Sequence, residues 1–118
     1  MREPRHPDLT DVTLTDVFYA LSDPTRLRIV SELADGRERS CSQFGLALTS
    51  ATWSYHFRVL REAGLTRTRV EGRHRLITLR HDEFDARFPA LLDAVLTSGG
   101  AAAATAAGRS ERAAGRAA

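Results

Sequence analysis

Residues 49–80 read TSATWSYHFRVLREAGLTRTRVEGRHRLITLR, and this stretch decides the fold. Its first half predicts an amphipathic helix, because Trp53, Phe57 and Leu60 recur at helical spacing and would face a core. Gly64 can adopt the left-handed conformation that commonly ends a helix. The side of the helix opposite the apolar stripe carries the side chains that remain available to a partner: Ser50, Thr52, Ser54, Tyr55 and Arg58.

The second half predicts a β-hairpin with strands over about 66–70 and 74–80. Gly72 between them permits the tight reversal of the chain. The whole stretch carries seven arginines against two glutamates, a charge of +5, whereas the complete chain carries only +2. Because cationic side chains displace counterions from a row of phosphates, a helix followed by a basic hairpin predicts DNA binding. The helix would enter a groove and the hairpin would serve as a wing.

Two further helices are expected upstream. Residues 11–22 repeat apolar side chains at helical spacing, namely Leu14, Val17, Phe18 and Leu21. Asp23 would cap a second helix and Pro24 would open it, because proline at the first helical position sacrifices no hydrogen bond. Gly36 would end it. The expected buried stripe of this second helix is Leu27, Val30, Leu33 and Ala34.

Shorter helical pieces are expected on both sides of the central stretch. Residues 41–47 predict about one and a half turns, with Phe44 pointing inward. After the hairpin, a helical segment begins near Asp82 and restarts after Pro89. Its apolar surface consists of Leu91, Leu92, Val95 and Leu96.

The first and last helices carry more apolar surface than one small core can absorb. We therefore expect a two-fold dimer interface built from both helices. Its centre would be formed by Leu14, Phe18, Leu92 and Leu96. The alternative is that both helices pack only on their own domain.

The organisation of the 118 residues is expected to be simple. Residues 1–9 form an N-terminal arm, residues 10–97 one DNA-binding and dimerisation domain, and residues 98–118 an Ala/Gly/Arg-rich flexible tail. No apolar run approaches the roughly 20 residues that span a bilayer, and no signal region precedes the domain, so a cytoplasmic protein without membrane contact is expected. Cys41 is the only cysteine, which excludes an intrachain disulfide.

Enzymatic function finds no support in the sequence. It contains no glycine-rich phosphate loop, no evident carboxylate pair and no nucleophile with a base, and no cofactor is implied. The competing hypothesis is a winged-helix module that contacts other proteins, because a fold does not fix a function. The confinement of the excess arginine to the central helix and hairpin favours DNA.

Three motifs in order give the chain a family resemblance: ALSDPTRLRIVSEL at 20–33, SYHFRVLREAGL at 54–65 and EGRHRLITL at 71–79. Over about residues 10–97 the sequence resembles the ArsR/SmtB family of bacterial winged helix-turn-helix repressors. The resemblance implies a mainly α fold with a small β-hairpin wing and a homodimer. It also implies recognition helices in successive major grooves of an inverted repeat, and repression that an effector relieves.

The resemblance also assigns residues. Carried over by position, the groove-facing set is Ser50, Thr52, Ser54, Tyr55, His56 and Arg58, and the wing set is Arg69, Arg73 and Arg75. His56 could instead lock the helix-turn-helix internally. Trp53 stands where the family usually has an aliphatic residue; a core position is expected, with base stacking as the alternative.

The sequence argues against a metal ion as the signal that this protein senses. Metal-sensing relatives use paired cysteines or spaced acids and histidines, whereas here Cys41 is alone and only His81 accompanies the acids of the last helices. No metal site is therefore expected. There remain an apolar small-molecule effector between the terminal helices, thiol oxidation or modification at Cys41, or no ligand. For the first of these, the lining would be Phe18, Phe84 and Phe88, although the same aromatics would also fill a plain core.

Overall fold

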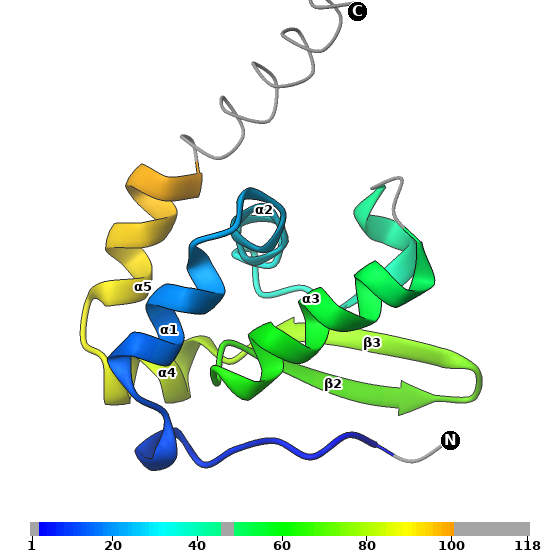
Figure 1. Ribbon diagram of the computed structural model, residues 1–118, viewed down its shortest axis with the longest axis horizontal. Coiled ribbons are helices and arrows are strands. Elements are labelled where there is room, and N and C mark those ends of the chain that lie inside the picture. Colours follow the sequence, from blue (N-terminus) through cyan, green and yellow to red (C-terminus); the bar gives the residue numbers. More distant parts are fainter. Residues whose placement is uncertain (1–2, 46–48, 101–118) are drawn as a thin grey trace, which may run out of the picture.

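A computed structural model describes residues 3–45 and 49–100 of the chain. The helical elements are η1 (Leu9–Asp11), α1 (Leu14–Leu21), α2 (Pro24–Glu32), η2 (Cys41–Phe44), α3 (Ser50–Glu62), α4 (His81–Arg87), α5 (Leu91–Ala94) and η3 (Val95–Gly100). The strands are β1 (Arg39–Ser40), β2 (Thr66–Glu71) and β3 (His74–Leu79). Figure 1 shows the β2–β3 hairpin extending alongside α3, with α1, α4 and α5 gathered at the opposite end. The predicted combination of helices and a small hairpin is confirmed.

Two of the segments predicted from sequence lie partly outside the described residues. Residues 46–48 of the expected short helix and residues 101–118 of the expected tail are outside the described residues. Among the helices that are described, none is long and apolar enough to cross a bilayer.

The helix boundaries follow from local side-chain chemistry. Asp23 accepts a hydrogen bond from the backbone N–H of Arg26 at 3.1 Å, and Pro24 occupies the first turn of α2, as predicted. At the start of α3, the Thr49 hydroxyl accepts the backbone N–H of Thr52 at 3.2 Å. Caps of this kind satisfy backbone donors that have no partner within the helix.

Gly64 follows the end of α3 and has φ +74°. A Cβ atom at this position would lie 2.8 Å from Cδ1 of Leu9. Glycine is therefore required here for two reasons: the backbone is left-handed, and the η1 segment approaches it closely.

The sheet has the strand order β1-β3-β2 and is antiparallel throughout. In the hairpin, Thr66 pairs with Leu79 and Glu71 with His74, and Gly72 in the turn has φ +60°. Strand β1 was not predicted. Its two residues pair with Ile77 and Leu76, and a strand this short has no readable alternation in sequence.

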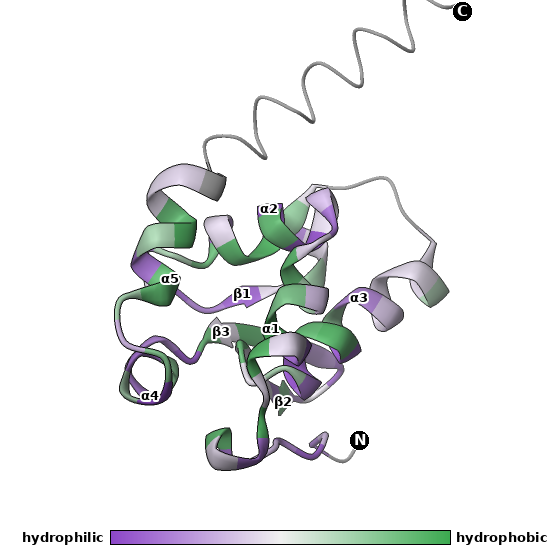
Figure 2. Cartoon of the chain, turned by 60° about the vertical axis from the view of Figure 1, so that its left-hand side comes forward, coloured by the Kyte–Doolittle hydropathy of each residue, from purple (hydrophilic) through white to green (hydrophobic). Residues whose placement is uncertain are grey.

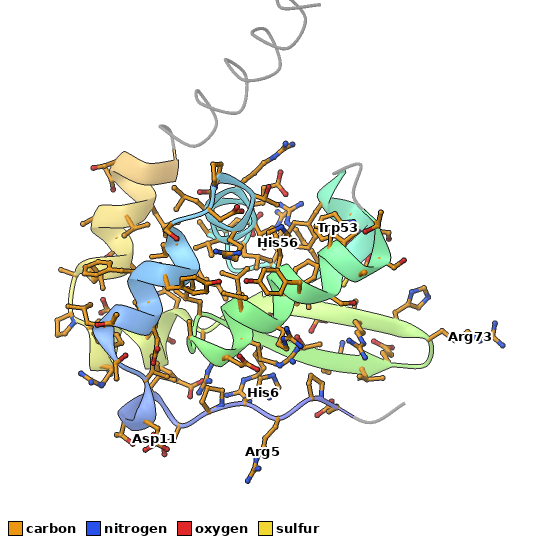
Figure 3. The ribbon with its side chains drawn as sticks, viewed as in Figure 1. Arg5, His6, Asp11, Trp53, His56 and Arg73 are labelled. Atoms are coloured by element: carbon orange, nitrogen blue, oxygen red, sulfur yellow. The ribbon has the colours of Figure 1, made fainter. Side chains whose placement is uncertain are left out.

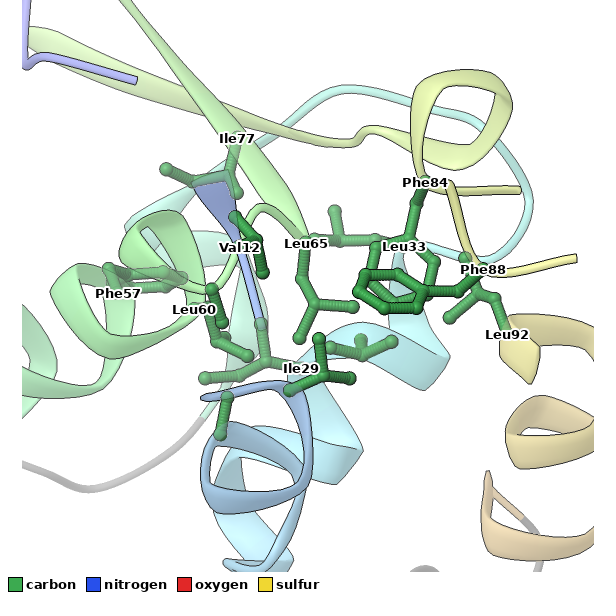
Figure 4. Close-up of a cluster of buried hydrophobic side chains, with 14 of the residues drawn as sticks. Val12, Ile29, Leu33, Phe57, Leu60, Leu65, Ile77, Phe84, Phe88 and Leu92 are labelled. Atoms are coloured by element: carbon green, nitrogen blue, oxygen red, sulfur yellow. The ribbon is translucent and has the colours of Figure 1, made fainter. Parts of the chain in front are cut away.

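One core joins the helices to the sheet (Figure 4). Figure 2 shows hydrophobic and hydrophilic residues on the same helices, which is the pattern of elements that bury one side. The largest fully buried side chains are Phe44, Phe84, Ile29, Leu33, Leu60, Leu65, Ile77 and Leu92. The inward position predicted for Phe44 is confirmed, as are those of Phe57 and Leu60. Of the stripe predicted for the second helix, Val30 and Leu33 are buried, Leu27 is half-buried and Ala34 is exposed. Ile29, which was not predicted, is buried as well.

The terminal helices correct one prediction and leave another open. Leu92 was expected at the centre of a dimer interface, but its side chain is 0% exposed within its own protomer. Leu14 and Phe18, from the same predicted set, are 44% and 54% exposed. Leu96 is half-buried against the core. An outward apolar face therefore exists on α1, and Leu92 takes no part in it.

The N-terminal arm runs along β2, which is an edge strand (Figure 1). The backbone N–H of Thr68 donates to Nε2 of His6 at 2.9 Å, and the Arg80 guanidinium donates to the carbonyl of Pro7 at 2.9 Å. Burial and the neighbouring Arg67 lower the pKa of His6, so its imidazole is neutral and able to accept this bond. The arm thus covers donors that an edge strand would otherwise expose.

Candidate nucleic-acid interface

The outer side of α3 carries the polar residues predicted for a DNA groove. Ser50, Ser54, Tyr55 and Arg58 are exposed. Thr52 is half-buried, and its hydroxyl lies 2.9 Å from that of Thr49, so it contributes to the helix cap. Of the set predicted to face a groove, the exposed side of α3 therefore carries Ser50, Ser54, Tyr55 and Arg58.

Tyr55 is held in place by α1. Its hydroxyl lies 2.7 Å from the hydroxyl of Tyr19, and the guanidinium of Arg58 stands 5.7 Å from its ring centroid. The hydrogen bond with Tyr55 raises the pKa of Tyr19, so this phenol stays protonated at neutral pH. Tyr19 was not among the residues predicted from sequence to support this face. The available signal was an aromatic residue adjacent to, but outside, the apolar stripe of the first helix.

His56 lies on the inner side of α3 and is only 9% exposed (Figure 3). Its Nδ1 atom is 3.2 Å from Nη1 of Arg26, and the carboxylate of Asp23 lies 3.9 Å away. Because a guanidinium can only donate, Nδ1 of His56 must be the acceptor. Arg26, itself 5% exposed, also donates from Nε to the carbonyl of Ala20 at 2.8 Å. This placement favours the internal role for His56, as the link between α2 and α3.

The arginines of the wing, here residues 66–80, differ in their partners. Arg73 sits at the hairpin tip and points away from the body of the protein (Figure 3), without an ion pair in the described part of the chain. Arg75 is exposed on β3. Arg69, by contrast, contacts Glu38 at 2.7 Å and Glu71 at 3.0 Å, and these carboxylates raise its pKa.

Two more arginines of the basic stretch act within the fold. Arg80 is buried and contacts Glu83 at 2.7 Å, while Arg67 contacts the same carboxylate at 3.0 Å. Both guanidiniums hold the pKa of Glu83 at about 2, Arg80 having the larger effect. The local charge of +5 therefore overstates the charge presented to a partner, because Arg67, Arg69 and Arg80 each have an acidic partner.

Known proteins with similar sequences and structures share this arrangement of helices and hairpin. A family model of the helix-turn-helix domain matches residues 21–69. YceK of Bacillus subtilis (strain 168), an uncharacterized HTH-type transcriptional regulator, is 42% identical over 86 residues, which cover 70% of this chain and 86% of YceK. A solved ArsR family transcriptional regulator is 27% identical over 68% of this chain and 89% of its own, with a TM-score of 0.58. The chain belongs to the ArsR family of helix-turn-helix transcriptional regulators.

A second solved relative of this ArsR-family protein is the transcriptional repressor BigR from Xylella fastidiosa. It is 26% identical over 71% of this chain and 83% of its own, with a TM-score of 0.55. The family consists of DNA-binding transcription regulators rather than enzymes, as predicted. The helix-turn-helix match over residues 21–69 includes α2, η2 and α3, and the β2–β3 hairpin that follows α3 is the wing.

The structure describes the surroundings of the two kinds of sensing site considered from sequence for this ArsR-family chain, a metal site and the Cys41 thiol. Among residues 3–45 and 49–100, no group of three or more His, Cys, Asp or Glu side chains could hold a metal ion. His81, which was considered with the acids of the last helices, contacts Asp93 at 3.1 Å. Burial raises the pKa of the Cys41 thiol, which therefore stays protonated at neutral pH and is a poor nucleophile.

The aromatic residues proposed to line an effector site between the terminal helices also have a different role. Phe84 and Phe88 are 0% and 8% exposed, and their ring centroids lie 5.1 Å apart. Both fill the core, whereas Phe18 points outward. Of the two alternatives weighed from sequence, the structure favours the plain core for this pair.

Proposed function

We propose that this protein is a repressor that binds an inverted repeat as a homodimer, with α3 in the major groove and the wing over the flanking phosphates. The observation that carries the proposal is the grouping of Ser50, Ser54, Tyr55 and Arg58 on one exposed face of α3. Hydroxyl, phenol and guanidinium groups are suited to base edges and phosphates. The name of the solved relative BigR, a transcriptional repressor, supports the direction of regulation.

The proposed division of labour follows from geometry. Tyr55 and Arg58 are steadied by each other and by Tyr19, so they can discriminate base sequence. Arg73 and Arg75 are exposed on the wing and would bind phosphates, which are the same in every sequence. Arg69 would contribute to phosphate binding less than Arg73, because Glu38 and Glu71 already compensate its charge.

The proposed dimer uses the outward face of α1. Leu14 and Phe18 are large apolar side chains left exposed by the protomer, and Leu96 adds to them from the C-terminal segment. Large exposed apolar side chains commonly mark an interaction site. In a two-fold dimer, both protomers would bury these same side chains in the interface. Dimerisation would set two recognition helices at the spacing of successive major grooves.

The test is fluorescence anisotropy with a duplex taken from the region upstream of the protein's own gene, measured over a salt series. Since Arg58, Arg73 and Arg75 are exposed on the proposed surface of each protomer, a dimer would neutralise roughly six phosphates, and log K should fall with a slope of about −5 against log salt. Tyr55→Ala should reduce discrimination between this duplex and random DNA, whereas Arg73→Ala should weaken both alike. Salt-independent binding, or no duplex binding, would instead support a module for protein contacts.

A further inference from the structure

A groove of 510 Å³ lies between η2, α3 and the sheet. Its apolar side is formed by Trp53, Phe57 and Ile77. The Trp53 and Phe57 rings are stacked, with centroids 5.2 Å apart and planes inclined by 8°. The volume is in the range of small-molecule sites, which are mostly apolar with a few polar groups that orient the ligand.

The polar side of the groove is entirely cationic or neutral. Arg58, Arg61 and Arg75 line it, and none of its lining residues is acidic. Within the described residues, neither Arg58 nor Arg61 forms an ion pair. Arg61 is half-buried, and this desolvation lowers the pKa of its guanidinium. A partly desolvated guanidinium without an acidic partner is a strong site for a bidentate anion.

The wall of the groove also contains an unused hydrogen-bonding group. Thr68 is 2% exposed, and its hydroxyl has no hydrogen-bond partner among the described residues. A buried polar group without a partner is costly and uncommon in folded proteins. The hydroxyl oxygen is itself covered by the protein, so a ligand in the groove would pack against the Thr68 side chain without bonding to this oxygen.

We propose that this groove binds a planar aromatic carboxylate or sulfonate, and that the bound anion excludes DNA from α3. The stacked aromatic wall would contribute nothing to a bare phosphate but matches a ring, while the arginines match the acid group. Exclusion follows because Ser50, Ser54, Tyr55 and Arg58 line the groove and belong to the proposed DNA-contact face. The exclusion step rests on the proposed function, whereas anion binding does not.

The first experiment tests the groove without DNA. Trp53 is the single tryptophan of the chain, so titration of the full chain with 1-anilinonaphthalene-8-sulfonate should quench its emission saturably, with one probe per protomer. Arg61→Gln should weaken binding by about fivefold or more, because it removes a charge-assisted contact. Arg37→Gln, the same change at an exposed site outside the groove, should leave binding within about twofold.

Two additional comparisons keep this experiment decisive. The neutral analogue N-phenyl-1-naphthylamine has the same rings without the sulfonate and should bind about tenfold more weakly. Thr68→Val, which replaces the covered hydroxyl by a methyl group of similar size, should leave sulfonate binding within about twofold and should not lower the melting temperature. The proposal is overturned if quenching does not saturate, or if Arg61→Gln and Arg37→Gln behave alike.

The second experiment tests exclusion. The probe at ten times its dissociation constant should raise the apparent Kd for a duplex by about tenfold if the two compete. Undiminished duplex affinity in the presence of bound probe would overturn exclusion. Absence of duplex binding without the probe would instead count against the proposed function, since the tryptophan titration judges the groove independently.

Discussion

Helix α3 and the C-terminal segment α5–η3 both carry partner-contact residues predicted from helical spacing, and the structure treats them differently. In α3, which is 13 residues long, the predicted apolar positions Phe57 and Leu60 are buried, while Ser54, Tyr55 and Arg58 are exposed. In α5, which has four residues, Leu92 is buried although it was assigned to an interface. Spacing therefore predicts orientation in a helix of several turns that packs on one side.

Spacing does not predict the orientation of the shorter helix α5, and the reason is structural. It begins directly after Ala90, which has φ +64°, so the chain changes direction immediately before it. The orientation of such a segment depends on the elements it contacts rather than on its own period. In helix α1, Val17 is buried, whereas Leu14 and Phe18, the positions assigned to the interface, are exposed on the protomer.

The largest expected effect is a loss of folding when the buried Leu92 of α5 is replaced by a charged residue. Leu92→Glu would place a carboxylate in a fully buried position, which costs about 4 kcal/mol or more and should abolish cooperative folding. Circular dichroism during thermal unfolding measures the loss. Ala94→Glu, an exposed position in the same helix, is the matched control and should change the melting temperature little. A stable Leu92→Glu protein would restore Leu92 to the proposed interface.

The second prediction addresses the outward face of α1. Phe18→Glu should leave each protomer folded but give monomers in sedimentation, because a two-fold interface would meet the new charge twice. Duplex affinity should then fall by about 100-fold or more, since a single half-site loses the contacts of the second recognition helix. Phe18→Leu retains an apolar side chain and should keep the dimer. A wild-type monomer at micromolar concentration would contradict the proposed interface.

A third, smaller effect distinguishes two arginines of the wing. Arg73→Ala should flatten the salt dependence by about one phosphate per protomer, with no change in melting temperature. Arg69→Ala should change the slope less, because Glu38 and Glu71 already compensate its charge. Anisotropy titrations at several salt concentrations compare the two. Equal slopes for both variants would show that the Arg69 ion pairs open when DNA binds.

The smallest expected effect concerns the N-terminal arm. The pKa of His6 is lowered in the folded protein, so its stabilising contribution is complete above the ordinary histidine value and is lost as pH falls through the folded pKa. Protonation blocks the acceptor atom that receives the Thr68 N–H. Relative to the other β2 amides, the Thr68 amide should lose protection against hydrogen exchange as the pH falls below the ordinary histidine value of about 6.5.

The matched variants for this effect are two histidine substitutions. His6→Ala should remove the pH dependence of Thr68 exchange, while His74→Ala, at the exposed hairpin end, should retain it. Exchange at Thr68 that follows the other β2 amides over the whole pH range would mean that the arm is not held through His6.

Local features of this protein, such as helix starts and turns, are encoded in short segments of its sequence. Asp23 with Pro24, Thr49, Gly64 and the turn at Gly72 each act on backbone groups a few residues away, so their effects can be read from the chain. The ordering of the helix-turn-helix and its wing follows from them. The polar face of α3 was also predictable, because a long amphipathic helix repeats its pattern several times.

Which charged side chains are free to meet a partner, and which apolar side chains are buried, depends on long-range packing. Arg69 meets Glu38, His56 meets Arg26 and Arg80 meets Pro7 across 31, 30 and 73 residues of chain. Packing likewise buried Leu92, left Phe18 outside and set three arginines around the groove beside α3. A side chain's hydrogen-bond partners and exposure depend on what the folded chain brings beside it, and no local period encodes that.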